Sequence, residues 1–384
     1  MENLVLYRKY RPKRFSEVVG QEHVVQTLSN ALSLGMISHA YLFAGPRGSG
    51  KTTIARLLAK AVNCQNRGEK EGEENKFSSS PFAKAREFEP CNKCSSCNEI
   101  NEGRAIDLLE IDAASNRGVD EIRELKDGIR FSPAKSKYKV FIIDESHQLT
   151  KEAANALLKT LEEPPAHAIF ILATTEIHKM IPTIISRCQR FDFRKLTLPE
   201  IIGRLELLVG KEGAQIERPA LELIALNSGG AIRDAEGLLD QVLTFGAKTA
   251  QEIKELLGMV DAELAGRFFD FICQKKSGAA IDFLNQVLEK GKDPQEFSKS
   301  LVSYLRQGLL LKISPDLQNP VIVGLTKEEQ EKLRSQVANF SEQEMKHFLK
   351  LFLEAENKMK YSSIPQLPLE LAIVEALEKE EKIR

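Results

Sequence analysis

The residues at positions 45–52 constrain the fold of this chain more than any other feature. They fit the pattern G-x-x-x-x-G-K-[ST], between the apolar segment AYLFAG at 40–45 and the helix-forming segment TTIARLLAKAV that begins at 52. In this context the glycines let backbone N–H groups close around an anion, and the helix N-terminus adds positive potential. A chance glycine-rich turn is the alternative. The predicted nucleotide-binding residues here are Gly45, Pro46, Arg47, Gly48, Ser49, Gly50, Lys51, Thr52 and Thr53.

Two acidic residues end the apolar segment KVFIIDE at 139–145. With a phosphate loop present, we expect Lys51 to reach the β- and γ-phosphates of ATP, and Thr52 and Asp144 to hold Mg²⁺. Glu145 is expected to orient and polarise the attacking water, because phosphoryl transfer depends mainly on positioning and charge. Alternatively, the two acids only cap the next helix.

Hydroxyl side chains end another apolar segment, AIFILATT at 168–175. From the end of a central strand, Thr174 or Thr175 would be able to contact the γ-phosphate or the attacking water. Ordinary turn residues are the alternative, because hydroxyl groups are common at strand ends.

Apolar segments alternate with helical patterns through the first half of the chain. Besides the three segments above, IDLLEID at 106–112 has this character. Short apolar runs separated by helices predict a parallel sheet covered on both faces, as in α/β nucleotide-binding folds. We therefore assign residues 1–195 to an α/β domain.

From about Leu196 the strand signals stop. The segment at 220–243 has apolar residues at helical spacing on both sides of Gly229 and Gly230, which predicts a small helical domain over 196–245. Helical patterns continue after this point, so residues 246–384 are predicted to form an all-helical domain. Its candidate helices are DAELAGRFFDFICQ, AAIDFLNQVLE, FSKSLVSYLRQGLLLKI and EQEMKHFLKLFLEAENKM.

Four of the six cysteines lie near one another in the sequence. Cys91, Cys94 and Cys97 have C-x2-C-x2-C spacing, and Cys64 lies at the end of the predicted phosphate-loop helix. Four thiolates form a closed tetrahedral site, so we predict a structural zinc ion in a module over about 64–97. Loss of the metal is expected to loosen this module and to leave ATP binding largely intact. A redox role and an iron–sulfur cluster are the alternatives.

Within this module, residues 66–89 mix charges of both signs with Ser and Gly and show no sustained apolar period. This composition predicts a mobile loop. The two remaining cysteines, Cys188 and Cys273, are expected to be packing residues without a metal.

Composition excludes several classes of protein. With 42% hydrophobic and 28% charged residues, the chain lacks the profile of a disordered protein. The net charge of −1 means that any binding to nucleic acid must come from a local patch. No apolar run approaches the roughly 20 residues of a membrane helix, and the N-terminus reverses the charge order of a signal peptide. We therefore expect a cytoplasmic protein without a membrane partner.

Several segments together carry a resemblance to a known family. They are LYRKYRPKRFSEVVGQ at 6–21, HAYLFAGPRGSGKTT at 39–53, IDAASNRGVDEIREL at 111–125, NALLKTLEEPP at 155–165 and ISRCQRFDF at 185–193. These segments closely resemble the tau/gamma subunits of bacterial DNA polymerase III, which are clamp-loader members of the AAA+ superfamily. The resemblance is strong to about residue 245 and looser beyond it.

The resemblance implies a DNA-dependent ATPase within the DNA polymerase III complex, a nucleotidyltransferase assembly. Such a subunit works with other clamp-loader subunits in a hetero-oligomeric ring, opening the sliding clamp and placing it on primed DNA. The implied fold is a P-loop AAA+ domain with a zinc-binding insertion, followed by a helical lid and an all-helical collar that mediates oligomerisation. The implied cofactors are ATP, Mg²⁺ and Zn²⁺.

The resemblance also implies roles for individual residues. Lys51 and Thr52 match the Walker A motif, Asp144 and Glu145 match Walker B, and Thr174 or Thr175 falls at the sensor 1 position. Arg187 falls on the arginine finger that reaches the nucleotide site of a neighbouring subunit, and Arg233 matches sensor 2 in the lid. Tyr7, Arg11, Val18 and Val19 would surround the adenine. Alternatively, Arg187 is a surface ion-pair partner and Arg233 a helix-capping cation.

Contacts with DNA are expected to involve phosphates rather than bases. Ser115 and Arg117, which precede the helical segment VDEIRELKDGI, are candidates together with the helix start after Thr150. Alternatively, Arg117 only solvates a loop.

Two departures from the family pattern are visible. The stretch between Cys64 and Cys91 is longer than expected, and the chain lacks the long C-terminal extension of the tau form, so it resembles the shorter gamma form. Another AAA+ DNA motor, for branch migration or helicase loading, and a structural adaptor that binds nucleotide without hydrolysing it are the competing functional hypotheses.

Overall fold

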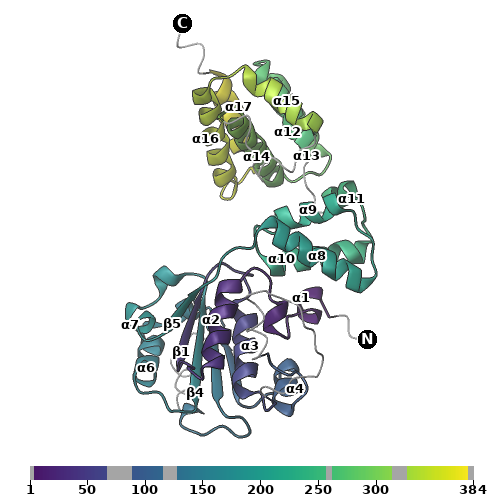
Figure 1. The fold of residues 1–384 in the computed structure, drawn as a ribbon. Coiled ribbons are helices and arrows are strands. Elements are labelled where there is room, and N and C mark those ends of the chain that lie inside the picture. The colour runs from purple at the N-terminus through teal and green to yellow at the C-terminus, as the bar shows by residue number, and fades with distance from the viewer. Residues whose placement is uncertain (1–3, 67–88, 116–127, 257–261, 314–326, 379–384) are drawn as a thin grey trace. The chain divides into compact units, whose positions relative to one another are not determined.

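The computed structural model describes residues 4–66, 89–115, 128–256, 262–313 and 327–378 (Figure 1). Contacts within the chain divide it into two compact units. Unit 1 consists of Met1–Gln215 and Ile224–Phe245, and unit 2 of Ile216–Leu223 and Gly246–Arg384. The predicted mobile loop at 66–89 lies almost entirely outside the described residues, and so does Arg117.

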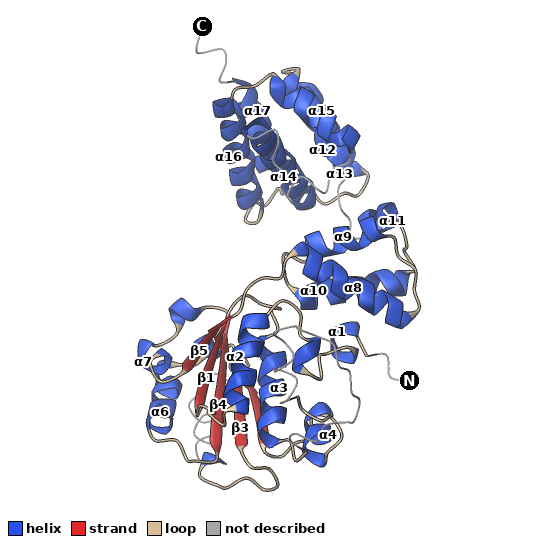
Figure 2. Cartoon of the chain, in the orientation of Figure 1, coloured by secondary structure: helices blue, strands red, loops and turns tan. Residues whose placement is uncertain are grey.

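Unit 1 contains a five-stranded sheet in the order β2-β3-β4-β1-β5, with every neighbouring pair parallel (Figure 2). The strands are β1 (Ala40–Ala44), β2 (Leu108–Asp112), β3 (Lys139–Asp144), β4 (Ala168–Thr174) and β5 (Gln189–Asp192). β1 and β4 are buried at every position, as expected of central parallel strands. The predicted parallel sheet is confirmed. β5 is an additional edge strand whose short, mostly polar sequence has a single buried side chain, Phe191.

Helices cover both faces of this sheet (Figure 1). Tyr41 and Phe43 of β1 pack on the face covered by α2 (Glu22–Ser33) and α3 (Lys51–Asn63). Leu42, between them, packs on the opposite face, which α6 (Lys151–Glu162) and α7 (Pro182–Ile185) cover. This alternation follows from the two-residue period of a strand. A sheet buried on both faces leaves its strand ends as the places where polar side chains can gather.

The register of the strands brings three strand ends together. Ala44 at the end of β1 pairs with Thr174 at the end of β4. Ile143, next to the end of β3, pairs with Leu172 on the other side of β4. The loop after β1 and the last residues of β3 and β4 therefore meet at one edge of the sheet.

Shorter elements lie around the sheet. The N-terminal segment contains α1 (Leu6–Lys9) and the 3-10 helix η1 (Phe15–Glu17), and the cysteine-rich segment contains α4 (Ser95–Asn101). The 3-10 helices η3 (Ser146–Gln148) and η4 (Ile177–Lys179) follow β3 and β4. Unit 1 also includes α8 (Leu198–Glu212) and α10 (Ile232–Phe245), and α9 (Arg218–Asn227) contributes residues to both units.

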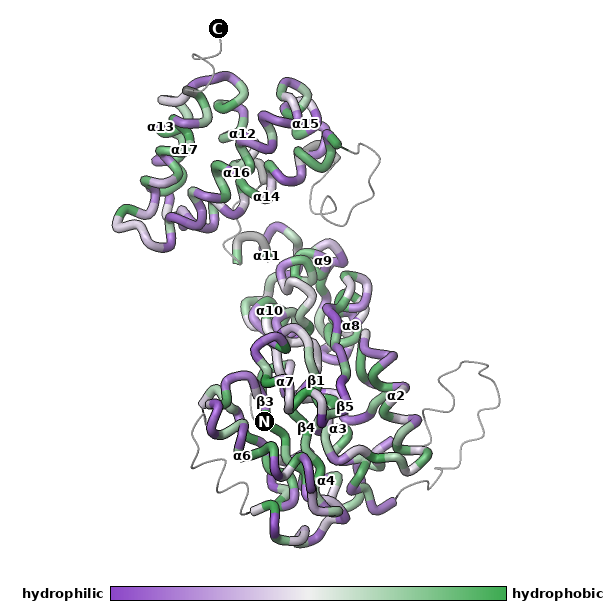
Figure 3. The backbone as a smooth tube through the Cα atoms, turned by 90° about the vertical axis from the view of Figure 1, so that its left-hand side faces the viewer, coloured by the Kyte–Doolittle hydropathy of each residue, from purple (hydrophilic) through white to green (hydrophobic). Residues whose placement is uncertain are grey.

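Unit 2 is helical throughout its described residues, as predicted. Its helices are α11 (Ala250–Leu256), α12 (Ala262–Cys273), α13 (Ser277–Glu289), α14 (Pro294–Ile313), α15 (Lys327–Ala338), α16 (Glu342–Met359) and α17 (Leu367–Glu378). Phe268 lies at the centre of the core, with its ring edge-to-face against Phe297 and Phe352. Figure 3 shows hydrophobic and hydrophilic residues alternating along these helices, the pattern of amphipathic packing. Among the helices described, none has the length and apolar character needed to cross a membrane.

Candidate nucleotide-binding site and cysteine cluster

The loop after β1 turns into α3 through glycines. Gly48 has φ 73° and Gly50, the residue before α3, has φ 98°, and side chains rarely tolerate these left-handed conformations. A Cβ atom at Gly48 would lie 2.8 Å from the Cβ of Ala231, so the loop packs closely against the segment before α10. The N–H groups in the first turn of α3 have no intrahelical acceptor. They are therefore suited to bind an anion.

Lys51 lies over this loop. Its Nζ donates hydrogen bonds to the carbonyl oxygens of Gly45 at 2.8 Å and Pro46 at 2.9 Å. Burial lowers the pKa of Lys51, while the nearby carboxylates of Glu145 and Asp144 act to raise it. Lys51 thus places a buried positive charge at the loop, beside the two acids. This charge is suited to bind phosphate.

A direct hydrogen bond joins the two predicted motifs. The Oγ1 of Thr52 donates to Oδ2 of Asp144 at 2.8 Å. Glu145 adopts a positive φ of 48°, which is uncommon for a residue with a side chain and clusters at functional sites. The structure therefore brings Lys51, Thr52, Asp144 and Glu145 to one edge of the sheet.

The two threonines at the end of β4 have different partners. Thr175 donates from Oγ1 to Oε2 of Glu145 at 2.9 Å, whereas Thr174 is fully buried. The Oγ1 of Thr174 accepts from the N–H of Glu176 and lies 3.0 Å from Nδ1 of His147. Thr175 is therefore the threonine in contact with the carboxylate, and Thr174 lies beneath it.

His147 is a residue of this site that the sequence reasoning did not include. Its side chain is 3% exposed, and Nδ1 lies 3.5 Å from Oε2 of Glu145 in addition to its contact with Thr174. Its position two residues after Glu145, in the turn that follows β3, was the available signal. A buried imidazole here supports the orientation of Glu145.

The N-terminal residues lie beside the helix that carries Arg233. The guanidinium carbon of Arg233 stands 4.8 Å from the centre of the Tyr7 ring, and Arg233 lowers the pKa of the Tyr7 hydroxyl. These two residues line a pocket of about 390 Å³, together with Leu238 and other residues of α9 and α10.

Arg11, Val18 and Val19 continue the N-terminal segment. All three are half-buried, and Val18 packs against the core beneath α2 and α3. Burial lowers the pKa of Arg11 to about 10, and the nearby guanidinium of Arg56 adds to this effect. Arg56 is itself paired with Glu110, and this carboxylate acts to raise the pKa of Arg11.

Arg187 follows α7, a helix on the face of the sheet opposite α3. Its Nη2 pairs with Oε1 of Glu162 at 2.5 Å, and its Nη1 donates to the carbonyl oxygen of Thr183 at 2.8 Å. Within the described parts of the chain, no contact is recorded between Arg187 and residues 45–53. The structure therefore does not bring this arginine to the phosphate loop of its own chain.

The candidate DNA-contacting residues have local partners. The hydroxyl of Ser115 donates to Oδ2 of Asp112 at 2.8 Å. Thr150 is the N-cap of α6 and accepts from the N–H of Ala153 at 3.2 Å. Both contacts position helix or loop starts, and neither by itself indicates DNA.

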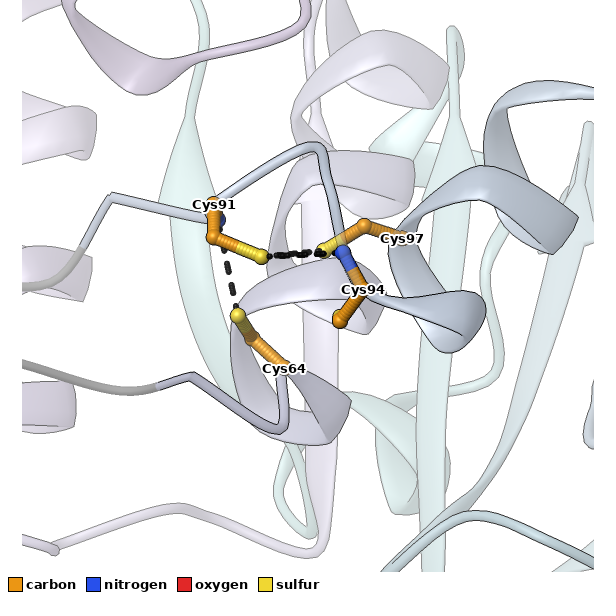
Figure 4. Close-up of side chains that lie close together, drawn as sticks. All are labelled: Cys64, Cys91, Cys94 and Cys97. Atoms are coloured by element: carbon orange, nitrogen blue, oxygen red, sulfur yellow. Dashed lines mark hydrogen bonds between the residues drawn. The ribbon is translucent and has the colours of Figure 1, made fainter. Parts of the chain in front are cut away.

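The four clustered cysteines converge in space. Cys64 directly follows α3, Cys91 and Cys94 lie on one loop, and Cys97 lies on α4 (Figure 4). Their sulfur atoms all lie within 4.8 Å of one another. In a tetrahedral zinc site with Zn–S bonds of about 2.3 Å, the sulfur atoms stand roughly 3.8 Å apart. The cluster therefore fits a zinc ion after small adjustments.

Backbone donors in the cluster also suit thiolates. Cys91 Sγ accepts from the N–H of Lys93 at 3.4 Å and of Cys94 at 3.3 Å. Burial opposes ionisation, but these hydrogen bonds lower the pKa of Cys91 to about 7. Burial raises the pKa of Cys64 and of Cys97, as expected for thiols that ionise when a cation is bound. 

The two other cysteines do not belong to this cluster. Cys188 packs against the core beneath α6 and α7, and Cys273 against the core of unit 2. Burial raises the pKa of each to about 12. Both fit packing roles.

Comparison with protein families matches nearly the whole chain. Residues 20–197 match the model described as DNA polymerase III, delta subunit. Residues 200–248 match DNA polymerase III clamp loader subunit, ATPase lid domain, and residues 248–383 match DNA polymerase III subunits gamma and tau domain III.

Curated relatives agree with these matches. The chain is 43% identical to DNA polymerase III subunit tau of Bacillus subtilis over 97% of this chain and 63% of that protein. It thus spans less than two thirds of the length of that relative. It is 35% identical to DNA polymerase III subunit gamma of Buchnera aphidicola subsp. Acyrthosiphon pisum, over 98% of this chain and 99% of that protein.

Among solved structures, the Thermotoga maritima RuvB Holliday junction branch migration motor is similar with a TM-score of 0.45 at 17% identity, covering 84% of this chain and 98% of that one. A likeness this distant decides nothing about function. The relatives that match along their whole length do decide the family. The chain belongs to the gamma/tau family of DNA polymerase III subunits.

Proposed function

We propose that this chain is an ATP-driven motor subunit of the DNA polymerase III clamp loader, opening the sliding clamp and loading it on primed DNA. The observation that carries the proposal is the hydrogen bond between Thr52 and Asp144, with Glu145 held beside it by Thr175. These side chains form the acidic half of an ATP hydrolysis site next to the phosphate loop. Family membership supplies the clamp-loading role. Because this role concerns bacterial DNA, we also propose a cytoplasmic location.

In this proposal each residue of the strand edge has a separate task. Lys51 and the N–H groups of residues 45–53 bind the phosphates, and Thr52 and Asp144 hold Mg²⁺. The metal, when bound, neutralises phosphate charge. Glu145 positions the attacking water, with its carboxylate oriented by Thr175. Thr174 contributes by holding His147 beneath that carboxylate.

The adenine and the lid are assigned to the N-terminal segment and α10. Tyr7, Arg11, Val18 and Val19 surround the base, and Arg233 senses the nucleotide from the lid. The contact between the Arg233 guanidinium and the Tyr7 ring, which places α10 beside the N-terminal segment, supports this assignment. Arg187 is assigned to the nucleotide site of a neighbouring subunit.

We further propose a division into an AAA+ domain at 1–195, a lid at 196–245 and a collar at 246–384. The three family models meet near these boundaries. The cysteine cluster is assigned a structural zinc ion, because a four-thiolate site leaves no position for a reacting water. Primed DNA, the sliding clamp and other clamp-loader subunits are the proposed partners.

Two competing functions are disfavoured. A structural adaptor has no need for the full set of Lys51, Thr52, Asp144 and Glu145 with their mutual hydrogen bonds. A branch-migration or helicase-loading motor does not account for the cysteine cluster or for similarity to gamma subunits along their whole length.

The test is ATP turnover by the chain assembled with partner subunits, clamp and primed DNA. Turnover should rise when clamp and primed DNA are both present. Glu145→Gln should abolish this turnover and retain ATP binding, whereas Lys51→Ala should abolish binding itself. If clamp and primed DNA do not change the rate of ATP turnover, clamp loading is contradicted. Unchanged turnover by Glu145→Gln would contradict the assigned site.

A further inference from the structure

Lys60, on α3, ties the N-terminal segment to the cysteine cluster. It is 2% exposed, and its Nζ donates to the carbonyl oxygen of Lys13 at 2.8 Å, to Oδ1 of Asn92 at 2.8 Å and to Oδ1 of Asn101 at 2.9 Å. Burial lowers the pKa of Lys60 to about 8. An ammonium group has three donors, and all three are used here. Displacing any of these partners leaves a buried donor unsatisfied, which is costly.

Glu89 makes a second connection of the same kind. Its two carboxylate oxygens accept from the N–H groups of Phe15 and Ser16, each at 2.7 Å. These are the first residues of η1, so Glu89 caps that helix from a distant part of the chain. Glu89 lies two residues before Cys91. The stretch that supplies a cysteine to the cluster thus also holds the N-terminal segment.

The other end of the N-terminal segment is bound to α8 and α10. The carbonyl oxygen of Tyr10 accepts from Nη2 of Arg204 at 2.6 Å. Arg204 is buried and pairs through Nε with Oε1 of Glu236 on α10 at 2.9 Å. Lys9 forms an ion pair with Glu212 at 2.7 Å. One segment therefore contacts α8 and α10 of the proposed lid, and a buried ion pair joins these two helices.

Little chain separates these two attachments. Tyr10 and Lys13 are three residues apart, a span of at most roughly 10 Å when fully extended. Pro12, between them, has a fixed φ. The chain between the two attachments therefore has little slack.

We propose that residues 7–17 form a strap through which the cysteine cluster sets the position of α8 and α10, and thereby the affinity for nucleotide. Glu89 and Lys60 are its positioning residues. The inference rests on the nucleotide site proposed above, at the pocket lined by Tyr7 and Arg233. It departs from the expectation that loss of the metal leaves ATP binding intact.

The test compares Glu89→Gln, Lys60→Met and the matched control Glu99→Gln in the full chain. Glu99 lies in the same module, but its ion pair is with Lys135 and it does not contact the strap. With Mg²⁺ and a fluorescent ATP analogue, Glu89→Gln should bind about three- to tenfold more weakly, as expected for one lost hydrogen bond. It should keep its metal content and show faster hydrogen exchange in residues 7–17 and in α8. Glu99→Gln should behave as wild type.

A second measurement separates coupling from general loss of structure. Removing zinc from the wild type with a chelator, followed by transfer into Mg²⁺ buffer without chelator, should weaken binding of the analogue. The same treatment should weaken Glu89→Gln much less, because two changes to one pathway are not additive. If strap exchange rises in Glu89→Gln and Lys60→Met while affinity stays at the wild-type value, the proposal is overturned. The proposal is also overturned if chelation weakens binding of the analogue by the same factor in Glu89→Gln as in the wild type. Wild-type protein that fails to bind the analogue would instead contradict the nucleotide site.

Discussion

At the scale of single residues, the end of β4 distinguishes two neighbouring threonines. Thr175 contacts the Glu145 carboxylate directly, and Thr174 reaches it only through His147. Successive residues of a strand face opposite sides, so neighbours of the same type occupy different environments. The orientation of the Glu145 carboxylate should therefore depend more directly on the Thr175 hydroxyl than on the Thr174 hydroxyl.

Thr175→Ala should lower the turnover number of the assembled loader about five- to thirtyfold, for a loss of roughly 1 to 2 kcal/mol of positioning. Nucleotide affinity should change little, because the Thr175 hydroxyl contacts Glu145 and not the phosphate loop. Thr175→Ser, which keeps the hydroxyl, should recover most of the rate in steady-state ATPase assays. A Thr175→Ala enzyme with full turnover would remove Thr175 from the mechanism.

At the scale of elements, the start of α8 carries a charge-dependent contribution to stability. Arg194 and the N–H of Thr197 hold the Glu200 carboxylate, and Arg194 in particular lowers the pKa of Glu200 from 4.5 to about 2. Because the pKa is lower in the folded state, ionised Glu200 stabilises the fold above about pH 4.5, and this stabilisation is lost as the pH falls toward 2. Glu200→Gln should therefore flatten the decline of the urea midpoint between about pH 5 and pH 3. If the urea midpoint falls equally steeply with pH in both proteins, the Glu200 carboxylate makes no pH-dependent contribution to stability.

The cysteine cluster gives a prediction about metal content. Four thiolates in a closed site should retain about one zinc ion per chain through purification. Cys94→Ser should lower the zinc content measured by elemental analysis and raise proteolytic cleavage within 64–97. Cys273→Ser, which removes a cysteine from the core of unit 2, is the control and should leave zinc unchanged. Native protein without zinc would rule out the assignment.

The motifs at the strand ends were predictable because parallel strands have their carboxyl ends at one edge. Asp144 and Thr174 end two apolar strands, and Lys51 follows the loop after a third. A parallel sheet places the ends of these strands side by side. The partners of Thr174 and Thr175 were not predictable, since a one-residue shift in register exchanges their environments. The contacts of Lys60 and Glu89 with residues 13–16 join distant parts of the sequence, and no local pattern signals them.

At the scale of the whole molecule, the position of Arg187 predicts a requirement for assembly. This arginine pairs with Glu162 on the face of the sheet opposite α3. Arg187→Ala should leave the nucleotide affinity of the isolated chain unchanged and lower the DNA-stimulated turnover of the assembled loader by about 10³- to 10⁵-fold. Arg190→Ala removes an exposed arginine from an ion pair with Asp192 and is the matched control. Full stimulated turnover by Arg187→Ala would end the trans mechanism.

The geometry of the cysteine cluster also matters for protein engineering. The sulfur atoms of Cys64 and Cys91 lie within 4.8 Å of each other, so the chain between these two cysteines starts and ends at one place. The entropy of closing a loop grows slowly with its length, by about 0.6 kcal/mol for each doubling. Peptide tags or fluorescent reporters inserted there should therefore cost the fold little. Glu89 is the exception within this stretch, because its carboxylate accepts hydrogen bonds from the backbone of Phe15 and Ser16.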